Sequence, residues 1–251
     1  MSSDNTTWET SQERPTAGAW RGQETLPGAT PGEVRYGPDI GTETDLRLLG
    51  DLRGKRVLEL GCGRAGSSIV FAQKGAVAVG VDTSAERLAE ARRLAEEAGV
   101  RIELRRADLA DLAFLRADTI DAVFSASALS HVEDLRRVFR QVHRVLKEGA
   151  PLVFSLTHPA YDMIDDDDPE PLVIRRSYFD RSPIAYDRDG AVSEYPRTFS
   201  DLFIDLVRTG FRVDVVLEPE PAPGGPRSPE WRETFHMVPR TLILRARKEG
   251  V

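Results

Sequence analysis

Short apolar runs alternate with segments of helical pattern along residues 56–157. The runs predicted as strands are residues 56–60, 77–81, 101–105, 121–125 and 151–156. The segments predicted as helices are residues 66–74, 84–98 and 132–146, where apolar side chains recur every three or four positions. This alternation predicts βαβ units and a mostly parallel sheet. Right-handed crossovers then place the ligand-binding loops at the carboxyl ends of the strands.

The alternation stops at His158, and the rest of the chain has a different order. Residues 158–197 read as an irregular insertion on the substrate side, followed by a helix at 198–209 and a strand at 211–217. A Pro/Gly-rich link at 219–229 precedes a last strand at 241–247. Because no helix joins the last two strands, we expect them to pair as an antiparallel hairpin.

The N-terminal region precedes this alternation. Residues 1–35 are polar and read as an arm or lid, and Thr42–Leu52 reads as a short helix capped by Thr42. We treat residues 1–251 as a single domain, since the 40% apolar content is enough for one sizeable core.

Charge and composition exclude several classes of protein. The net charge of −7, from 41 acidic and 34 basic residues, argues against a nucleic-acid surface. No apolar run approaches the roughly 20 residues of a membrane span, and the N-terminus has no basic or apolar leader pattern. The one cysteine, Cys62, rules out an intrachain disulfide. We therefore expect a cytoplasmic protein.

The stretch V-L-E-L-G-C-G-R-A-G at 57–66 places bare backbone directly after a strand. Gly61, Gly63 and Gly66 form G-x-G-x-x-G, and Asp82 ends the next strand at the distance expected for a ribose-binding acid. These features suit a dinucleotide or S-adenosylmethionine. Glu59 favours the second, since a carboxylate there could bind the ammonium of an amino-acid tail, whereas the nucleotide fingerprint requires none.

Further motifs accompany the glycine loop. They are G-V-D-T-S at 80–84, A-D-L at 107–109, D-A-V-F-S at 121–125 and H-R-V-L-K-E-G at 143–149. Together with V-L-E-L-G-C-G, they resemble the class I S-adenosylmethionine-dependent methyltransferases, and more narrowly their small-molecule, type 11 branch. The resemblance covers roughly residues 36–157. It implies a Rossmann-like, doubly wound sheet of seven strands, mostly parallel, with an antiparallel last strand.

The resemblance also implies which residues hold the cofactor. They are Tyr36, Glu59, Gly61, Cys62, Gly63, Asp82, Thr83, Asp108, Leu109 and Ser125. Glu59 and the glycine loop would frame the methionine moiety, and Asp82 would accept hydrogen bonds from both ribose hydroxyls. Asp108 would accept one from the adenine amino group, while Thr83 and Leu109 flank the ring. The third glycine of the family pattern is Ala65 here. Its methyl group is small, so we expect it to be tolerated, with Gly66 sharing the role; crowding of the cofactor by Ala65 would instead weaken binding.

Methyl transfer from a sulfonium is an in-line displacement, so the enzyme mainly aligns the reactants and excludes water. A general base is needed only if the acceptor holds a proton. His131 and His158 are the candidates for this catalytic role; alternatively, they are packing residues of a helix start and a turn. Tyr161 and Arg197 are the candidate substrate residues. No metal is expected.

The predicted function is S-adenosylmethionine-dependent methyl transfer to a small, partly apolar acceptor, such as a bacterial secondary metabolite. We expect neither a nucleic-acid nor a membrane partner, and a homodimer is an open option. Transfer to oxygen, nitrogen or carbon is undecided. Two alternatives remain: an NAD-dependent oxidoreductase, although no Tyr-x-x-x-Lys pair is found, and a cofactor-binding relative without activity.

Overall fold

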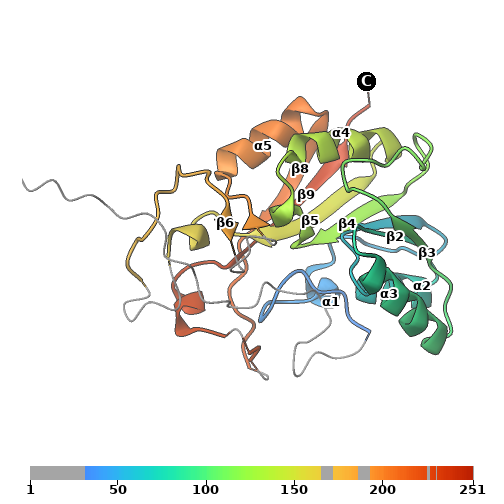
Figure 1. Cartoon of the computed structure of the whole chain (residues 1–251), viewed down its shortest axis with the longest axis horizontal. Coiled ribbons are helices and arrows are strands. Elements are labelled where there is room, and N and C mark those ends of the chain that lie inside the picture. The colour runs from blue at the N-terminus through green and yellow to red at the C-terminus, as the bar shows by residue number, and fades with distance from the viewer. Residues whose placement is uncertain (1–31, 165–171, 186–192, 225–226, 230, 251) are drawn as a thin grey trace, which may run out of the picture.

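A computed structural model describes residues 32–164, 172–185, 193–224, 227–229 and 231–250. In this part of the chain, a central seven-stranded sheet has the order β3-β2-β1-β4-β5-β9-β8 (Figure 1). Its strands are β1 (Arg56–Leu60), β2 (Val77–Asp82), β3 (Glu103–Arg106), β4 (Ala122–Ala126), β5 (Pro151–Thr157), β8 (Phe211–Leu217) and β9 (Thr241–Lys248). A separate two-stranded hairpin joins β6 (Ile184–Ala185) and β7 (Ser193–Glu194).

Strand β9 is antiparallel to both of its neighbours, and the other central pairs are parallel. The hairpin predicted for the last two strands is confirmed, and so is the Rossmann-like sheet with an antiparallel last strand. In the order of the sheet, β9 lies between β5 and β8. A purely parallel dinucleotide-binding sheet with strand order 3-2-1-4-5-6 has no such strand.

The helices cover the two faces of the sheet. They are α1 (Glu43–Leu46), α2 (Gly66–Gln73), α3 (Ala85–Glu97), α4 (Leu135–Val145) and α5 (Phe199–Arg208), with short 3₁₀ turns η1 (Ala128–His131), η2 (Tyr161–Met163) and η3 (Glu233–His236). Figure 1 shows α4 and α5 on one face and α1, α2 and α3 on the other. A separate apolar cluster fills each face, with Phe139 and Leu206 in one and Phe71 and Phe124 in the other.

Side-chain caps set several helix boundaries. The Ser84 hydroxyl accepts from the backbone N–H of Arg87, as expected for the predicted N-cap, and Gly99 ends α3 with a φ of +66°. The helix predicted for 132–146 begins only at Leu135. There the carboxylate of Asp134 accepts from the N–H of Arg137 at 2.9 Å, and the preceding residues turn as η1.

The helix predicted for Thr42–Leu52 is wrong beyond its first turn. Thr42 forms the expected cap, but the helix ends at Leu46 because Arg47 adopts a left-handed conformation with φ of 51°. The carboxylate of Glu43 then accepts hydrogen bonds from the N–H groups of Leu48 and Leu49. Leu48, Leu49 and Leu52 are buried in an irregular segment instead of on a helix face.

None of the helices in the described ranges is both long and apolar enough to cross a membrane.

Candidate functional site

The glycine loop between β1 and α2 has a backbone that only glycine adopts easily. Gly61 and Gly63 have φ values of +68° and +53°. A Cβ on Gly61 would lie 2.1 Å from the Cβ of Ala128 in η1. The loop therefore packs directly against the turn after β4, and a side chain at position 61 is excluded by both conformation and space.

Ala65 has a left-handed backbone as well, with φ of 60° and ψ of 33°, at the start of α2. Its side chain is fully buried and packs in a small cluster with Cys62, Leu88 and Ala91. The methyl group thus faces α3 and not solvent. The Sγ of Cys62 lies on the same side, 2.9 Å from where a Cβ on Gly80 would stand. Any contact of Cys62 with a cofactor would therefore have to use its backbone.

Asp82, at the end of β2, binds the glycine loop to the start of α3. One carboxylate oxygen accepts from the N–H of Gly63 at 2.8 Å, and the other accepts from the N–H of Ser84 at 2.8 Å. Each oxygen keeps a second lone pair for a ligand hydroxyl. The side chain is almost completely buried. Its contact with a ribose stays a prediction, and the geometry is compatible with it.

Glu59 is a buried carboxylate beneath the glycine loop. One of its oxygens accepts from the backbone N–H of Ser68 at 2.8 Å and from the Ser68 hydroxyl at 2.5 Å. Burial is the main cause that raises the pKa of Glu59 to about 7, and the nearby charge of Asp82 raises it further. The groups that oppose this shift are hydrogen-bond donors of Ser67 and Ser68, none of them a cation. A cationic ligand group would stabilise the ionised form.

The remaining cofactor candidates line the same edge of the sheet. Asp108 is exposed and holds the N–H of Ala110 at 2.7 Å, while Leu109 is buried next to Gly61. Thr83 is exposed, and its carbonyl accepts from Arg106. Ser125 is fully buried, and its hydroxyl donates to the carbonyl of Leu60 at 2.9 Å. Ser125 therefore fastens β4 to β1.

Tyr36 lies in the core and has no exposed surface. Its ring packs edge-on against Phe124, and its hydroxyl donates to Glu43 at 2.5 Å. Burial next to that carboxylate raises the pKa of Tyr36 far above its usual range. This position argues against the predicted cofactor contact. The rest of the predicted arm, including Trp8 and Trp20, lies outside the described residues apart from 32–35.

His131 ends η1 and is half-buried. Its Nδ1 lies 2.9 Å from the carbonyl oxygen of Ser193 in β7. Because a carbonyl only accepts, Nδ1 must carry the proton of the neutral ring, and Nε2 then holds the lone pair. The geometry gives His131 the tautomer of a general base.

His158 follows β5, and both of its ring nitrogens have partners. Nδ1 accepts from the N–H of Ala160 at 3.0 Å, so Nε2 carries the proton and donates to Glu218 at 2.8 Å. This arrangement leaves no lone pair for a substrate. It argues against the catalytic role predicted for His158 and suits a residue that closes the turn after the strand.

Of the two substrate candidates, Tyr161 remains compatible with the predicted role and Arg197 does not. Tyr161 packs edge-on against Phe235, with ring centroids 5.9 Å apart, in an aromatic group that includes Trp231 and the guanidinium of Arg240. Arg197 instead donates to the backbone carbonyls of Tyr195, Val132 and Glu133. These bonds argue against the substrate role predicted for Arg197.

Sequence reasoning missed three contributors to this edge: Ser193, Trp231 and Phe235. Ser193 and Phe235 contact residues many positions away, His131 and Tyr161, and Trp231 packs on Phe235. Neither hydrophobic period nor motif spacing marks such contacts. The acidic run at 165–168 lies outside the described residues. Within the part of the chain that is described, no cluster of three His, Cys, Asp or Glu side chains could hold a metal ion.

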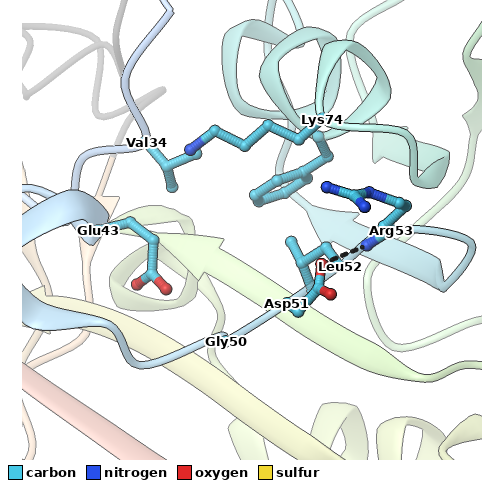
Figure 2. A pocket seen from close by; sticks show the side chains of 8 residues that line it. Val34, Glu43, Gly50, Asp51, Leu52, Arg53 and Lys74 are labelled. Atoms are coloured by element: carbon cyan, nitrogen blue, oxygen red, sulfur yellow. Dashed lines mark hydrogen bonds between the residues drawn. The ribbon is translucent and has the colours of Figure 1, made fainter.

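A cavity of about 250 Å³ lies at the other edge of the sheet (Figure 2). It is lined by Val34, Glu43, Gly50, Asp51, Leu52, Arg53, Phe71 and Lys74. Arg53 precedes β1 and Lys74 follows α2, so this cavity is separated from the glycine loop by the length of the strands. It does not belong to the candidate site.

Comparisons with known proteins agree with this geometry. A family model described as "Methyltransferase domain" matches residues 57–149. A solved S-adenosylmethionine dependent methyltransferase from Mesorhizobium loti is 32% identical, with a TM-score of 0.68 over 82% of this chain and 96% of that one.

Two curated relatives match over a shorter length. A ubiquinone biosynthesis O-methyltransferase from Hahella chejuensis is 40% identical over 104 residues, which are 41% of this chain and 44% of the relative. A protein of the same name from Pseudomonas syringae pv. tomato is 37% identical over 105 residues, which are 42% of this chain and 45% of the relative. The chain thus spans a little under half the length of these relatives.

Proposed function

Since the chain belongs to the S-adenosylmethionine-dependent methyltransferases, we propose that it methylates a hydroxyl oxygen of a small, partly apolar acceptor. The proposed acceptor is a bacterial metabolite that carries a phenol group. The proposal goes beyond family membership in two respects, the acceptor atom and the residue that takes its proton.

The residues at the glycine loop fit the cofactor of this family. Glu59 would pair with the ammonium, which would offset the part of its burial cost that the Ser67 and Ser68 hydrogen bonds leave. Asp82 would accept from ribose hydroxyls with the lone pairs left by its two backbone bonds. Asp108 and Leu109 would contact the adenine. When bound, the cofactor supplies an electrophilic methyl group on a positively charged sulfur.

The tautomer of His131 carries the proposal of an oxygen acceptor. A hydroxyl group keeps its proton at neutral pH, so its methylation benefits from a positioned base. The Ser193 carbonyl holds the proton of His131 on Nδ1, and Nε2 is then able to receive the proton of the hydroxyl. His131 would hold that proton until it exchanges with solvent.

The acceptor class is supported by the aromatic group next to β5. Tyr161 and Trp231 are partly exposed around the buried ring of Phe235, and planar rings pack well against such edges. The ubiquinone biosynthesis O-methyltransferase that is 40% identical over 104 residues acts on oxygen by its name, which also supports oxygen as the acceptor atom.

The alternative of an NAD-dependent oxidoreductase loses its support, because the sheet carries the antiparallel β9 and the relatives are methyltransferases. The second alternative is a protein that binds the cofactor but catalyses no methyl transfer. Detection of methylated product would exclude it. A cytoplasmic location, a homodimer and the absence of a nucleic-acid partner stay predictions.

The first experiment is a calorimetric titration with S-adenosylhomocysteine, with NAD as the parallel control. We expect micromolar binding of the first compound only. Purified protein is then incubated with methyl-labelled S-adenosylmethionine and matched phenols, aliphatic alcohols, amines and carboxylic acids. Label transfer to phenols that is lost in His131→Asn supports the proposal. Transfer only to amines, or undiminished transfer by His131→Asn, contradicts it.

A further inference from the structure

Residues 193–197 run alongside the turn that carries His131, and we call this segment the strap. The carbonyl of Ser193 accepts from Nδ1 of His131 at 2.9 Å. Two residues further on, the N–H of Tyr195 donates to the carbonyl of Ser130 at 2.9 Å. The strap therefore touches consecutive residues of the turn, from more than 60 positions away in the sequence.

Arg197 closes the strap at its far end. One nitrogen of its guanidinium donates to the carbonyl of Tyr195 at 2.8 Å, within the strap itself. The other donates to the carbonyls of Val132 and Glu133, the two residues after His131. The planar guanidinium thus joins the strap to the segment after His131 through three carbonyls, a geometry that requires the forked donors of arginine.

Arg197 is half-buried, and the hydrogen bonds of its guanidinium go to backbone carbonyls instead of to a carboxylate. Burial lowers the pKa of Arg197 from its usual value, and the charges of Asp205, Asp201 and Asp134 oppose that shift. A guanidinium in this setting is stabilised by its carbonyl partners. The strap and the turn must therefore keep their relative positions for the cost of burial to be offset.

We propose that Arg197 is a positioning residue that holds the strap against the η1 turn, so that Ser193 fixes the Nδ1–H tautomer of His131. The inference rests on the proposed function in one respect, the role of His131 as the base. Arg197 itself touches neither the acceptor nor the cofactor. Without the guanidinium of Arg197, the Ser193 carbonyl moves away from Nδ1 of His131. The ring then also adopts the tautomer in which Nε2 is protonated and cannot accept a proton.

A tautomer measurement tests the strap without any knowledge of the acceptor. The chain has four histidines, so nitrogen-15 labelling of histidine gives few imidazole signals, and His131→Asn and His158→Asn assign two of them. In the wild type we expect His131 as the Nδ1–H form at a pH where the ring is neutral. In Arg197→Lys and Arg197→Gln we expect the Nε2–H form to become populated.

Arg144 provides a matched control. Its guanidinium also forks onto backbone carbonyls, those of Leu112 and Leu115 at 2.7 and 2.8 Å, but at the end of α4 that lies away from His131. Arg144→Lys should reduce stability by a similar amount and leave the His131 signals unchanged. If Arg197→Lys and Arg144→Lys changed the His131 signals equally, the change would come from a general loss of stability. That result would overturn the inference.

Kinetics with an acceptor found in the label-transfer assay give the second readout. We expect Arg197→Lys to lower kcat about 10-fold or more, as for loss of a positioned base, with the KM of the acceptor and the affinity for S-adenosylhomocysteine changed less than about twofold. An unchanged tautomer and unchanged kcat in both folded Arg197 variants would refute the strap. If His131→Asn stays fully active while Arg197→Lys still shifts the tautomer, the base role fails and the strap contact stands.

Discussion

The buried carboxylate of Glu59 lowers the stability of the ligand-free fold above about pH 5. Its carboxylate is buried, hydrogen-bonded to Ser67 and Ser68, and its pKa is about 7 against an ordinary value of 4.5. Between these pH values the folded state binds more protons than the unfolded state. The free energy of unfolding therefore falls as the pH rises through this window.

We predict that Glu59→Gln stabilises the ligand-free protein at pH 8 by about 1–3 kcal/mol, because the variant removes a buried charge whose pKa is shifted upward. At pH 5, where Glu59 is already protonated in the folded state, the gain should be much smaller. Urea unfolding at the two pH values measures the difference, and calorimetry should show at least about tenfold weaker binding of S-adenosylhomocysteine. Equal stability changes at both pH values would contradict this account.

Gly61 allows a second test at the same scale. Gly61→Ala should lower the free energy of unfolding by about 2–5 kcal/mol, since a left-handed alanine costs roughly 1–2 kcal/mol and overpacking roughly 1–3 kcal/mol. The new methyl group would collide with Ala128. The double variant Gly61→Ala/Ala128→Gly should recover part of the loss in urea unfolding. Strictly additive effects would show that the two positions do not touch.

The position of the glycine-loop residues in the sheet could be predicted from the sequence because these residues lie near strand ends; their contacts with a cofactor stay predictions. Glu59 lies one residue before the end of β1, Asp82 ends β2 and Asp108 follows β3, so the parallel sheet alone brings them to one edge. The hydrogen-bond partners of His131 and Arg197 could not be predicted from strand positions in the sequence. Their contacts depend on how an irregular insertion folds back over the turn after β4, and no periodic pattern encodes that path.

Among the elements, α2, α3 and α5 were predicted to within one residue at each end. α3 and α5 begin next to Ser84 and Thr198, whose hydroxyls accept backbone N–H groups of the first turn. α1 was predicted too long, because the leucines after it are spaced as on a helix face. In the structure, the N–H groups of Leu48 and Leu49 donate to the carboxylate of Glu43 instead of to helix carbonyls, and the helix ends early. A carboxylate that competes for backbone donors leaves the apolar pattern unchanged, so the pattern could not show it.

The turn after β5 gives the prediction at the element scale. His158→Asn should retain most of the methyl transfer activity, because the asparagine oxygen can replace Nδ1 as the acceptor for the N–H of Ala160. His158→Leu removes that acceptor and should destabilise the fold by about 1–3 kcal/mol. Label-transfer assays and thermal unfolding of both variants provide the test. Loss of activity in a stable His158→Asn would return His158 to the catalytic residues.

In the whole molecule, Asp39 connects the N-terminal segment to the long link between β8 and β9. Its carboxylate accepts from the N–H of Ser228 at 2.7 Å and from the Ser228 hydroxyl at 2.5 Å, and its carbonyl accepts from the N–H of Ala222 at 2.7 Å. Asp39 also has a φ of 60°, which asparagine tolerates better than alanine. These contacts join segments almost 190 residues apart.

We predict that Asp39→Ala accelerates amide hydrogen exchange in residues 222–224 and 227–229, and lowers the free energy of unfolding by about 1–3 kcal/mol. Asp39→Asn keeps one acceptor oxygen and the left-handed backbone, so it should show a smaller effect. Exchange in β1 and β2 serves as the internal reference. A uniform increase over the whole sheet would instead indicate global destabilisation.

The position of β9 affects how the chain folds as it is made. β5 leaves the ribosome about 90 residues before the strand that will cover its edge, since Pro151–Thr157 pairs with Thr241–Lys248. β8 also has to wait for β9, its neighbour in the sheet. During that interval the nascent chain exposes an apolar strand edge that other strands can pair with. The pairing of β9 with both β5 and β8 is therefore the step that completes the sheet and covers these two strand edges.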